Sequence, residues 1–357
     1  MIRLVTAGES HGPQLTVILE GLPAGLPLDE DLIRADLARR QIALGAGGRM
    51  SIETDRAAIV GGVLAGCTTG APVALAIANA NHEAWKGKSV PAYTTPRPGH
   101  ADFAAAVKYG YDDVRPALER ASARETASRV AAGACCRAML GEFGIAVEGR
   151  VVALGGVPCD GADETSVAHI EQARKEGETL GGVIEVVAKG LPVGLGSHVS
   201  ADRRLDARLA AAVMSIPAIK GVEIGDGFAL AAMKGTETRG RMGGLAGGIT
   251  DGDPLVVRAA MKPIPTTLKP QPTVDLATGE PARTVYERSD VCPVPRAVVV
   301  VEAAVCLVLA DALAEKLGGD SLGEMKARFA QLPSTCRLSP SAKTFWFEKM
   351  VGSTATP

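Results

Sequence analysis

A nearly unbroken run of apolar residues in the last fifth of the chain constrains the fold more than any other feature. Residues 298–313 read VVVVEAAVCLVLADAL, so a helix here is apolar around its whole circumference. Such a helix has to be covered by protein on every side. A membrane span is not expected, because the run is short and Glu302 and Asp311 interrupt it. The pattern favours a core helix sandwiched between sheets.

The composition is that of a globular protein and limits its partners. The chain has 357 residues, of which 46% are hydrophobic, 22% charged and only 3% aromatic, with 42 glycines. The core must therefore be built mainly from aliphatic side chains. A formal net charge of −2 argues against a nucleic-acid partner.

The cysteines and the N-terminus predict a cytoplasmic protein. Seven cysteines are scattered without CxxC spacing, which favours reduced thiols over a disulfide framework or a zinc site. Residues 1–5 pass directly into a Gly-Glu-Ser-His turn, so no signal peptide is expected. No HExxH spacing is present, and we expect no metal site.

Strands and helices are predicted along most of the chain. Strand patterns occupy residues 2–6, 15–19, 51–60, 72–78, 183–188 and 255–261. Helices are predicted from residue 28 to 40, from Pro116 to about Gly141 or Gly144, and from about Asp202 to the residues before Pro217. Residues 155–179 are polar and acidic, which indicates a peripheral excursion. We expect one domain over residues 1–333 and a loosely ordered C-terminal tail over 334–357.

The helix after Pro116 carries a candidate anion site. Small and aliphatic residues share one of its faces, namely Ala123, Ala127, Val130, Ala134 and Ala138. Arg120 and Arg124 are one turn apart beside that face. Together with the Ser122 hydroxyl they form a plausible cradle for a polyanion.

Two histidines are predicted to lie on turns. Pro96 and Pro98 hold the backbone extended before Gly99, which leaves His100 on a shaped loop. His11 lies in the 8–12 turn between two predicted strands. An imidazolium can protonate a leaving phosphate, while arginine and lysine hold anionic oxygens and a carboxylate accepts a proton. The residues therefore favour chemistry in which a phosphate departs.

Several motifs in order resemble the chorismate synthase family from Gly8 to about Leu313. They are GESHG at 8–12, TTGAP at 68–72, RPGHAD at 97–102, SARET at 122–126, GVEIGDGF at 221–228 and KPIPT at 262–266. The resemblance implies an α+β fold with core helices between two antiparallel β-sheets, in a homotetramer. It also implies a lyase that converts 5-enolpyruvylshikimate 3-phosphate to chorismate, with reduced FMN required but not consumed.

The resemblance implies a role for each matching residue. His11 would protonate the leaving phosphate, His100 would protonate the reduced flavin, and Asp290 with Ser10 would remove the proton by way of the flavin. The implied substrate-binding residues are Arg40, Arg49 and Arg124. The implied cofactor-binding residues are Ala121, Ser122, Ala123, Ala218, Gly247, Lys262, Pro263, Ile264, Pro265, Thr266 and Arg288.

Three positions depart from the family pattern. Ala46 replaces an arginine, Ala121 replaces a serine, and Pro217 replaces an asparagine that meets the flavin. Loss of one charge-assisted contact typically costs about 1.5 to 3 kcal/mol, roughly ten- to a hundredfold in affinity. We expect activity to survive with weaker flavin or substrate binding. The alternatives are a flavin- or phosphate-binding homologue without turnover, and an enzyme for a different phosphorylated carboxylate.

No NAD(P)H fingerprint accompanies these motifs. The glycine cluster at 243–248 lacks GxGxxG spacing and the acidic partner of a dinucleotide site. NADPH is therefore expected to act only indirectly, through an external flavin reductase.

Overall fold

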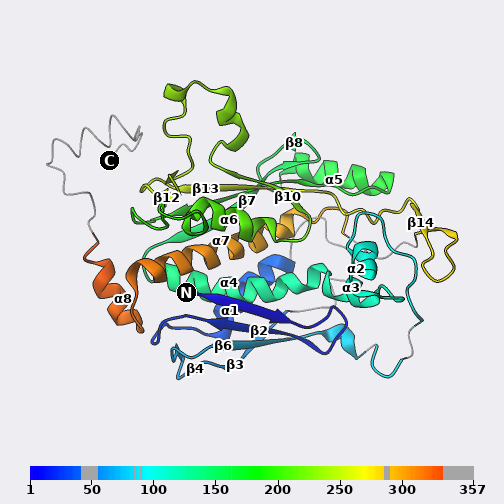
Figure 1. The fold of residues 1–357 in the computed structure, drawn as a ribbon, viewed down its shortest axis with the longest axis horizontal. Helices are drawn as coiled ribbons and strands as arrows, with labels where there is room; N and C mark the ends of the chain where they lie inside the picture. The colour runs from blue at the N-terminus through cyan, green and yellow to red at the C-terminus, as the bar shows by residue number, and fades with distance from the viewer. Residues whose placement is uncertain (42–54, 84, 89–90, 162, 285–289, 333–357) are drawn as a thin grey trace.

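The computed structural model describes residues 1–41, 55–83, 85–88, 91–161, 163–284 and 290–332. The expected tail at 334–357 lies outside these residues. Two antiparallel sheets enclose a layer of helices, as Figure 1 shows. The α+β sandwich predicted above is confirmed.

The first sheet has four strands and one well-buried face. Its strand order is β1 (Arg3–Ala7), β2 (Gln14–Glu20), β6 (Val73–Ala78) and β3 (Ala57–Gly61). Alternation along β2 and β6 directs large aliphatic side chains toward the helices, and the register pairs Leu15 with Ile77 and Val17 with Leu75. The hairpin of β4 (Val63–Leu64) and β5 (Cys67–Thr68) follows β3.

The second sheet has five strands. Its order is β10 (Ile219–Ile224), β13 (Leu255–Met261), β9 (Gly182–Lys189), β7 (Ala146–Leu154) and β8 (Val157–Pro158). Helix α5 (Glu164–Glu176) lies on the side of this sheet that faces away from the core (Figure 1). Two small hairpins complete the strands, β11 (Leu245–Ala246) with β12 (Ile249–Thr250) and β14 (Pro272–Val274) with β15 (Pro281–Arg283).

Four helices fill the space between the sheets. They are α1 (Glu30–Gln41), α4 (Thr126–Gly141), α6 (Leu205–Met214) and α7 (Val294–Leu317). Helix α4 packs toward the first sheet and α7 toward the second. By length and composition alone α7 could cross a membrane, but most of it is buried inside this protein. It is the apolar helix that the sequence predicts, and α8 (Leu322–Phe329) follows it.

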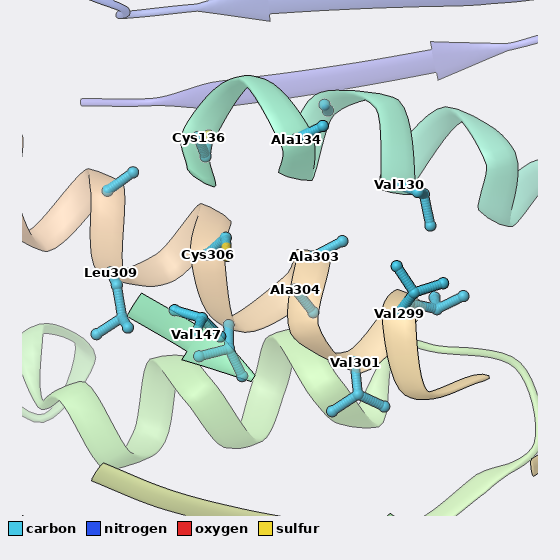
Figure 2. Close-up of a cluster of buried hydrophobic side chains, with 14 of the residues drawn as sticks. Val130, Ala134, Cys136, Val147, Val299, Val301, Ala303, Ala304, Cys306 and Leu309 are labelled. Carbon is cyan, nitrogen blue, oxygen red and sulfur yellow. The ribbon is translucent and has the colours of Figure 1, made fainter. Parts of the chain in front are cut away.

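The contact between α4 and α7 depends on small residues. Figure 2 shows Val130 and Ala134 of α4 facing Val299 and Ala303 of α7. A Cβ atom added at Gly133 would lie 2.3 Å from the Cβ of Ala303 and 2.6 Å from its Cα. The glycine, which is not part of the predicted small-residue face, therefore allows the two backbones to approach closely.

A buried carboxylate ties these helices together. Glu302 of α7 is fully buried and accepts two hydrogen bonds of 2.7 Å from Arg39 of α1. Arg137 of α4 and the backbone amide of Gly149 in β7 also donate to it, each at 2.7 Å. The only acidic residue in the first half of α7 is thus neutralised by partners on α1 and α4.

The helix predicted from Pro116 to about Gly141 or Gly144 is interrupted, and this part of the prediction is wrong. The segment forms α3 (Arg115–Arg120), the short 3-10 helix η2 (Ala123–Glu125), and then α4. Ser122 is extended between them, with φ −63° and ψ 144°, because its side chain caps η2 by accepting from the amide of Arg124. Arg120 and Arg124 consequently do not share a helix face.

Other local predictions also differ from the structure. Helix α2 (Asp102–Tyr109) and α5 were not expected, and in the described part of residues 51–60 only those from Ala57 onward form a strand. Asp202 lies in a 3-10 turn and does not cap α6, although Leu205, Leu209 and Val213 are buried as predicted. The remaining 3-10 segments are η1 (Ala80–His82), η3 (Ala201–Arg203), η4 (Gly227–Ala232) and η5 (Gly235–Glu237).

Candidate active site

The loop that carries His11 is held by hydrogen bonds from neighbouring elements. Asn79, at the end of β6, donates from Nδ2 to the carbonyls of Glu9 (3.0 Å) and Gly12 (2.8 Å). His82 donates from Nδ1 to the carbonyl of His11 at 3.0 Å. These contacts fix the backbone of the predicted turn against the first sheet, so the position of His11 is set by the fold.

His11 itself pairs with a carboxylate on α3. Its Nδ1 lies 2.6 Å from Oε1 of Glu119, and its backbone amide donates to Oε2 of the same residue at 2.7 Å. The ring also meets Trp85 with a centroid separation of 4.9 Å. The imidazole is therefore presented in one orientation.

Ser10 and Ser122 meet beside this histidine. Ser10 is buried, and the hydroxyl of Ser122 donates to its Oγ at 3.2 Å. The amide of Ser10 donates to the carbonyl of Glu119 at 3.2 Å. The break between α3 and η2 is what brings Ser122 to this place. Two residues assigned to different roles by resemblance thus lie in contact.

Two of the predicted substrate-binding arginines converge on one acid. Arg40 of α1 and Arg124 of η2 both pair with Asp55, Arg40 at 3.2 Å, and all three side chains are buried. Arg124 also donates from Nε to Oδ1 of Asn79 at 2.8 Å. Because Asn79 also binds the 8–12 loop, the arginine pair and His11 belong to one connected cluster.

Arg120 does not join this cluster, contrary to prediction. Its guanidinium donates to the backbone carbonyls of Thr6 (3.1 Å) and Gly8 (3.3 Å) and to the Thr6 hydroxyl. The cause is the end of α3 at Arg120, which turns this side chain toward β1. Its role is to hold the strand that leads into the loop.

His100 lies in a second cluster, against the 262–266 segment. Lys262 donates from Nζ to the carbonyl of Gly99 at 3.0 Å, and Nε2 of His100 is 3.4 Å from Oγ1 of Thr266. A Cβ at Gly99, where φ is +74°, would lie 2.8 Å from the Cγ of Pro265. The predicted shaped loop and the predicted extended segment are therefore in direct contact, and only glycine permits it.

Burial and positive charge influence the titration of this second cluster. Burial, followed by the charge of Arg97, lowers the pKa of His100 below its ordinary 6.5. Burial and the charge of Lys220 lower the pKa of Lys262. Both shifts disfavour the charged form of each side chain, and an anion bound here would favour the protonated form of His100.

Backbone contacts place Ala218 and Asp290 at the same end of the molecule. Ala218 adopts a left-handed φ of +70° and accepts from the amide of Lys262 at 2.9 Å. Thr179 bonds to the carbonyl of Ile264 at 2.6 Å, and the next residue, Leu180, bonds to that of Val291 at 2.8 Å. Asp290 precedes α7 and pairs with Arg296 at 2.7 Å.

One predicted cofactor-binding residue, Gly247, lies far from the others within this molecule. Gly247 is in the β11–β12 hairpin, at the opposite end of the long axis from α2, α3 and β14 (Figure 1). Ala46, Arg49 and Arg288 lie outside the described residues. Ala121 caps the end of α3 and Ala123 begins η2, next to the His11 cluster.

Sequence reasoning missed three residues of the His11 cluster. Glu119, Asp55 and Asn79 bind predicted site residues, yet none belongs to a motif named above. Asn79 offered a weak signal, since a polar residue directly follows an apolar strand pattern. The other two offered none, because their partners are distant in sequence.

The fold gathers histidines, arginines and a lysine into two clusters, and side chains of these types suit an enzyme that binds anions and transfers protons. Among the described residues, no group of three or more His, Cys, Asp or Glu is arranged to hold a metal ion. The cysteines in the described residues are all free thiols.

Comparison with known proteins identifies the family. The family model described as chorismate synthase matches residues 2–314. Chorismate synthase of Geobacter sulfurreducens is 49% identical over 383 residues, covering 92% of this chain and 98% of the relative. That of Moorella thermoacetica is 50% identical over 374 residues, with the same coverage. A solved structure titled "Crystal Structure of Chorismate Synthase" aligns with a TM-score of 0.74 and 39% identity, over 92% of this chain and 96% of that one.

The chain belongs to the chorismate synthase family. It is therefore an enzyme, a lyase of the shikimate pathway, and its family implies dependence on a flavin. The fold and the recognition predicted from sequence motifs are confirmed.

Proposed function

We propose that the chain converts 5-enolpyruvylshikimate 3-phosphate to chorismate and phosphate by 1,4-elimination, with reduced FMN bound and not consumed. One observation carries the proposal. His11 is held in a single orientation within a cluster that also contains the buried Arg40 and Arg124. An acid beside paired cations suits the departure of a phosphate.

His11 acts as the acid for the leaving phosphate in this proposal. Its Nδ1 is engaged by Glu119, which leaves Nε2 to give a proton to the departing oxygen. Arg40, Arg124 and Arg49 hold the anionic groups of the substrate. Asp55 keeps the first two guanidiniums in place.

The residues of the second cluster fit the phosphate and ring system of FMN. The segment from Lys262 through Pro263, Ile264 and Pro265 to Thr266 provides an ammonium group and a rigid wall, and Gly99 allows close backbone approach. Ala218, Arg288, Ala121, Ser122 and Ala123 complete the proposed cradle. When bound, reduced FMN supplies an electron transiently to the substrate. In this proposal a bound anion favours the imidazolium of His100, whose Nδ1 donates to the carbonyl of Pro98 and whose Nε2, beside Thr266, then carries the second proton. Asp290 with Ser10 accepts the proton that leaves the substrate ring.

We propose a homotetramer in the cytoplasm. Gly247 lies far from the other cofactor residues of its own chain (Figure 1), so its place in a flavin site requires the hairpin of a second copy. Light scattering tests this, and a monomeric mass would contradict it. Flavin reduction is assigned to an external NADPH-dependent reductase, so NADPH and FMN alone should support no anaerobic turnover.

An anaerobic assay with chemically reduced FMN tests the reaction. Chorismate and phosphate are followed together after addition of 5-enolpyruvylshikimate 3-phosphate, and we expect equimolar release. FMN binding without either product would instead favour a binding homologue that lost turnover through Ala46, Ala121 and Pro217. Activity only on another phosphorylated carboxylate in a substrate panel would contradict the assigned substrate.

A further inference from the structure

We propose that Glu119 is a positioning residue that fixes the tautomer and direction of the His11 ring. The inference deepens the proposed function, because it concerns the nitrogen from which the phosphate receives its proton. Both oxygens of the carboxylate face the same residue, Oε1 toward Nδ1 at 2.6 Å and Oε2 toward the backbone amide at 2.7 Å. Glu119 thus fixes the ring and the backbone of His11 together.

The contact determines which ring nitrogen carries the permanent proton. An ionised carboxylate only accepts hydrogen bonds, so Nδ1 must donate to it. The neutral ring then exposes Nε2 as an acceptor, and the imidazolium exposes it as a donor. Nε2 is therefore the only ring nitrogen that exchanges a proton with a ligand.

The end of α3 holds the pair in place from several sides. The carbonyl of Glu119 accepts from the amide of Ser10 at 3.2 Å, and the adjacent Arg120 binds the carbonyl of Gly8 at 3.3 Å. The two side chains are only 20% and 13% exposed, so water competes weakly for the bond. Trp85 packs against the ring at 4.9 Å. The orientation is consequently built into the fold before any ligand binds.

This arrangement requires no ring movement during proton transfer. As the carbon–oxygen bond of the substrate breaks, its electron pair remains on the phosphate oxygen, which takes the proton from Nε2. The imidazolium becomes a neutral ring whose Nδ1 proton still bonds to the Glu119 carboxylate. The role parallels the carboxylate that orients histidine in hydrolytic triads.

Glu119→Gln tests the role while preserving shape. An amide offers one accepting oxygen and one NH2 group, so it cannot accept from both Nδ1 and the backbone amide. We expect kcat for phosphate release to fall about ten- to a hundredfold, with the substrate KM and the FMN Kd within about threefold of wild type. Glu171→Gln on the outer helix α5 is the matched control and should leave all three unchanged. A Glu119→Gln enzyme with wild-type kcat would overturn the proposal.

A second measurement determines the tautomer of the His11 ring without requiring turnover. The chain has five histidines, so ¹⁵N side-chain NMR of the labelled protein can resolve each ring, with His11→Gln for assignment. We expect a proton on Nδ1 of His11 in the wild type and a changed tautomer in Glu119→Gln. A wild-type ring protonated only at Nε2 would contradict the proposal. If the ring is as expected but the wild type releases no phosphate, the proposed function fails while the role of Glu119 in fixing the ring is supported.

Discussion

Glycine allows two segments of the chain to pack closely at two places in this molecule, and the two contacts have different consequences. At Gly133 the backbones of α4 and α7 meet so tightly that an added Cβ would lie 2.3 Å from that of Ala303. At Gly99 a loop packs against Pro265, and an added Cβ would lie 2.8 Å from the Cγ of that proline. The first contact lies in the packed core, whereas the second joins His100 to the proposed flavin segment. The core contact should therefore control stability, and the loop contact should control ligand binding.

Buried charge follows the same division. Glu302 in the core pairs with Arg39 and Arg137 and so connects the helices α7, α1 and α4. Asp55 forms ion pairs with Arg40 and Arg124. Arg124 also donates to Asn79, which binds the loop that carries His11. Each carboxylate therefore pairs with two arginines, but Glu302 stabilises the scaffold whereas Asp55 stabilises the candidate site.

The largest expected effect is on the core carboxylate. Glu302→Ala removes the fully buried carboxylate that Arg39 and Arg137 share and leaves them to pair with Asp36, which should lower the free energy of unfolding by about 3 to 5 kcal/mol. Glu315→Ala, on the same helix but with a 37% exposed side chain, should cost less than about 1 kcal/mol. Urea denaturation of both variants checks this, and equal losses would show that burial of the ion pairs does not matter.

A methyl group in the helix contact should cost somewhat less. Gly133→Ala forces α4 away from α7 and should lower the free energy of unfolding by about 2 to 3 kcal/mol. Gly141→Ala lies in the same helix with nothing within 4 Å, and should be neutral or stabilising by up to about 1 kcal/mol. Thermal unfolding separates the two, and a stable Gly133→Ala variant would refute the tight packing.

Substitution at the loop contact should affect FMN binding more than it affects the stability of the fold. Gly99→Ala should weaken FMN binding about tenfold, equivalent to about 1.4 kcal/mol, because the methyl group displaces Pro265 of the 262–266 segment. Gly87→Ala provides the control, since its φ of +73° imposes similar backbone strain but nothing lies within 4 Å. Fluorescence titration of FMN measures both. Equal FMN affinities of the two variants would contradict the claim that the contact at Gly99 controls ligand binding.

The smallest effect concerns the charge on His100. Burial and the charge of Arg97 lower the pKa of His100, so the ring should titrate below 6.5 in the free protein. The pKa should rise when FMN supplies an anion. Because the folded-state pKa is depressed, protons favour the unfolded chain as pH falls below 6.5, and stability should decline there. Histidine NMR titration with and without FMN follows the ring. A pKa above 6.5 in the free protein would contradict the assigned environment.

Much of the scaffold was predictable from periodicity. The apolar run at 298–313 required a covered helix, and the alternation of residues 15–19 and 72–78 defined the paired strands β2 and β6. The break at Ser122 was not predictable in this way. A serine that caps a new helix resembles a serine within a helix until its backbone partner is known.

The site was only partly accessible for a related reason. Local composition marks the loops of His11 and His100, because glycine and proline shape them directly. Glu119 and Asp55 act through partners 108 and 69 residues away, at His11 and Arg124, and only the tertiary fold joins them. The proposed distribution of the cofactor residues between copies, suggested by Gly247, is likewise beyond the reach of local patterns.

The most direct test of the account is the single-turnover rate of phosphate release from His11→Ala with reduced FMN bound under anaerobic conditions. General acid catalysis typically contributes about 10² to 10⁴ in rate, so we predict a loss of at least about a hundredfold with the FMN Kd unchanged. His169→Ala, on the outer helix α5, is the control and should retain the wild-type rate. Phosphate release from His11→Ala at the wild-type rate would contradict the assignment of His11 as the acid.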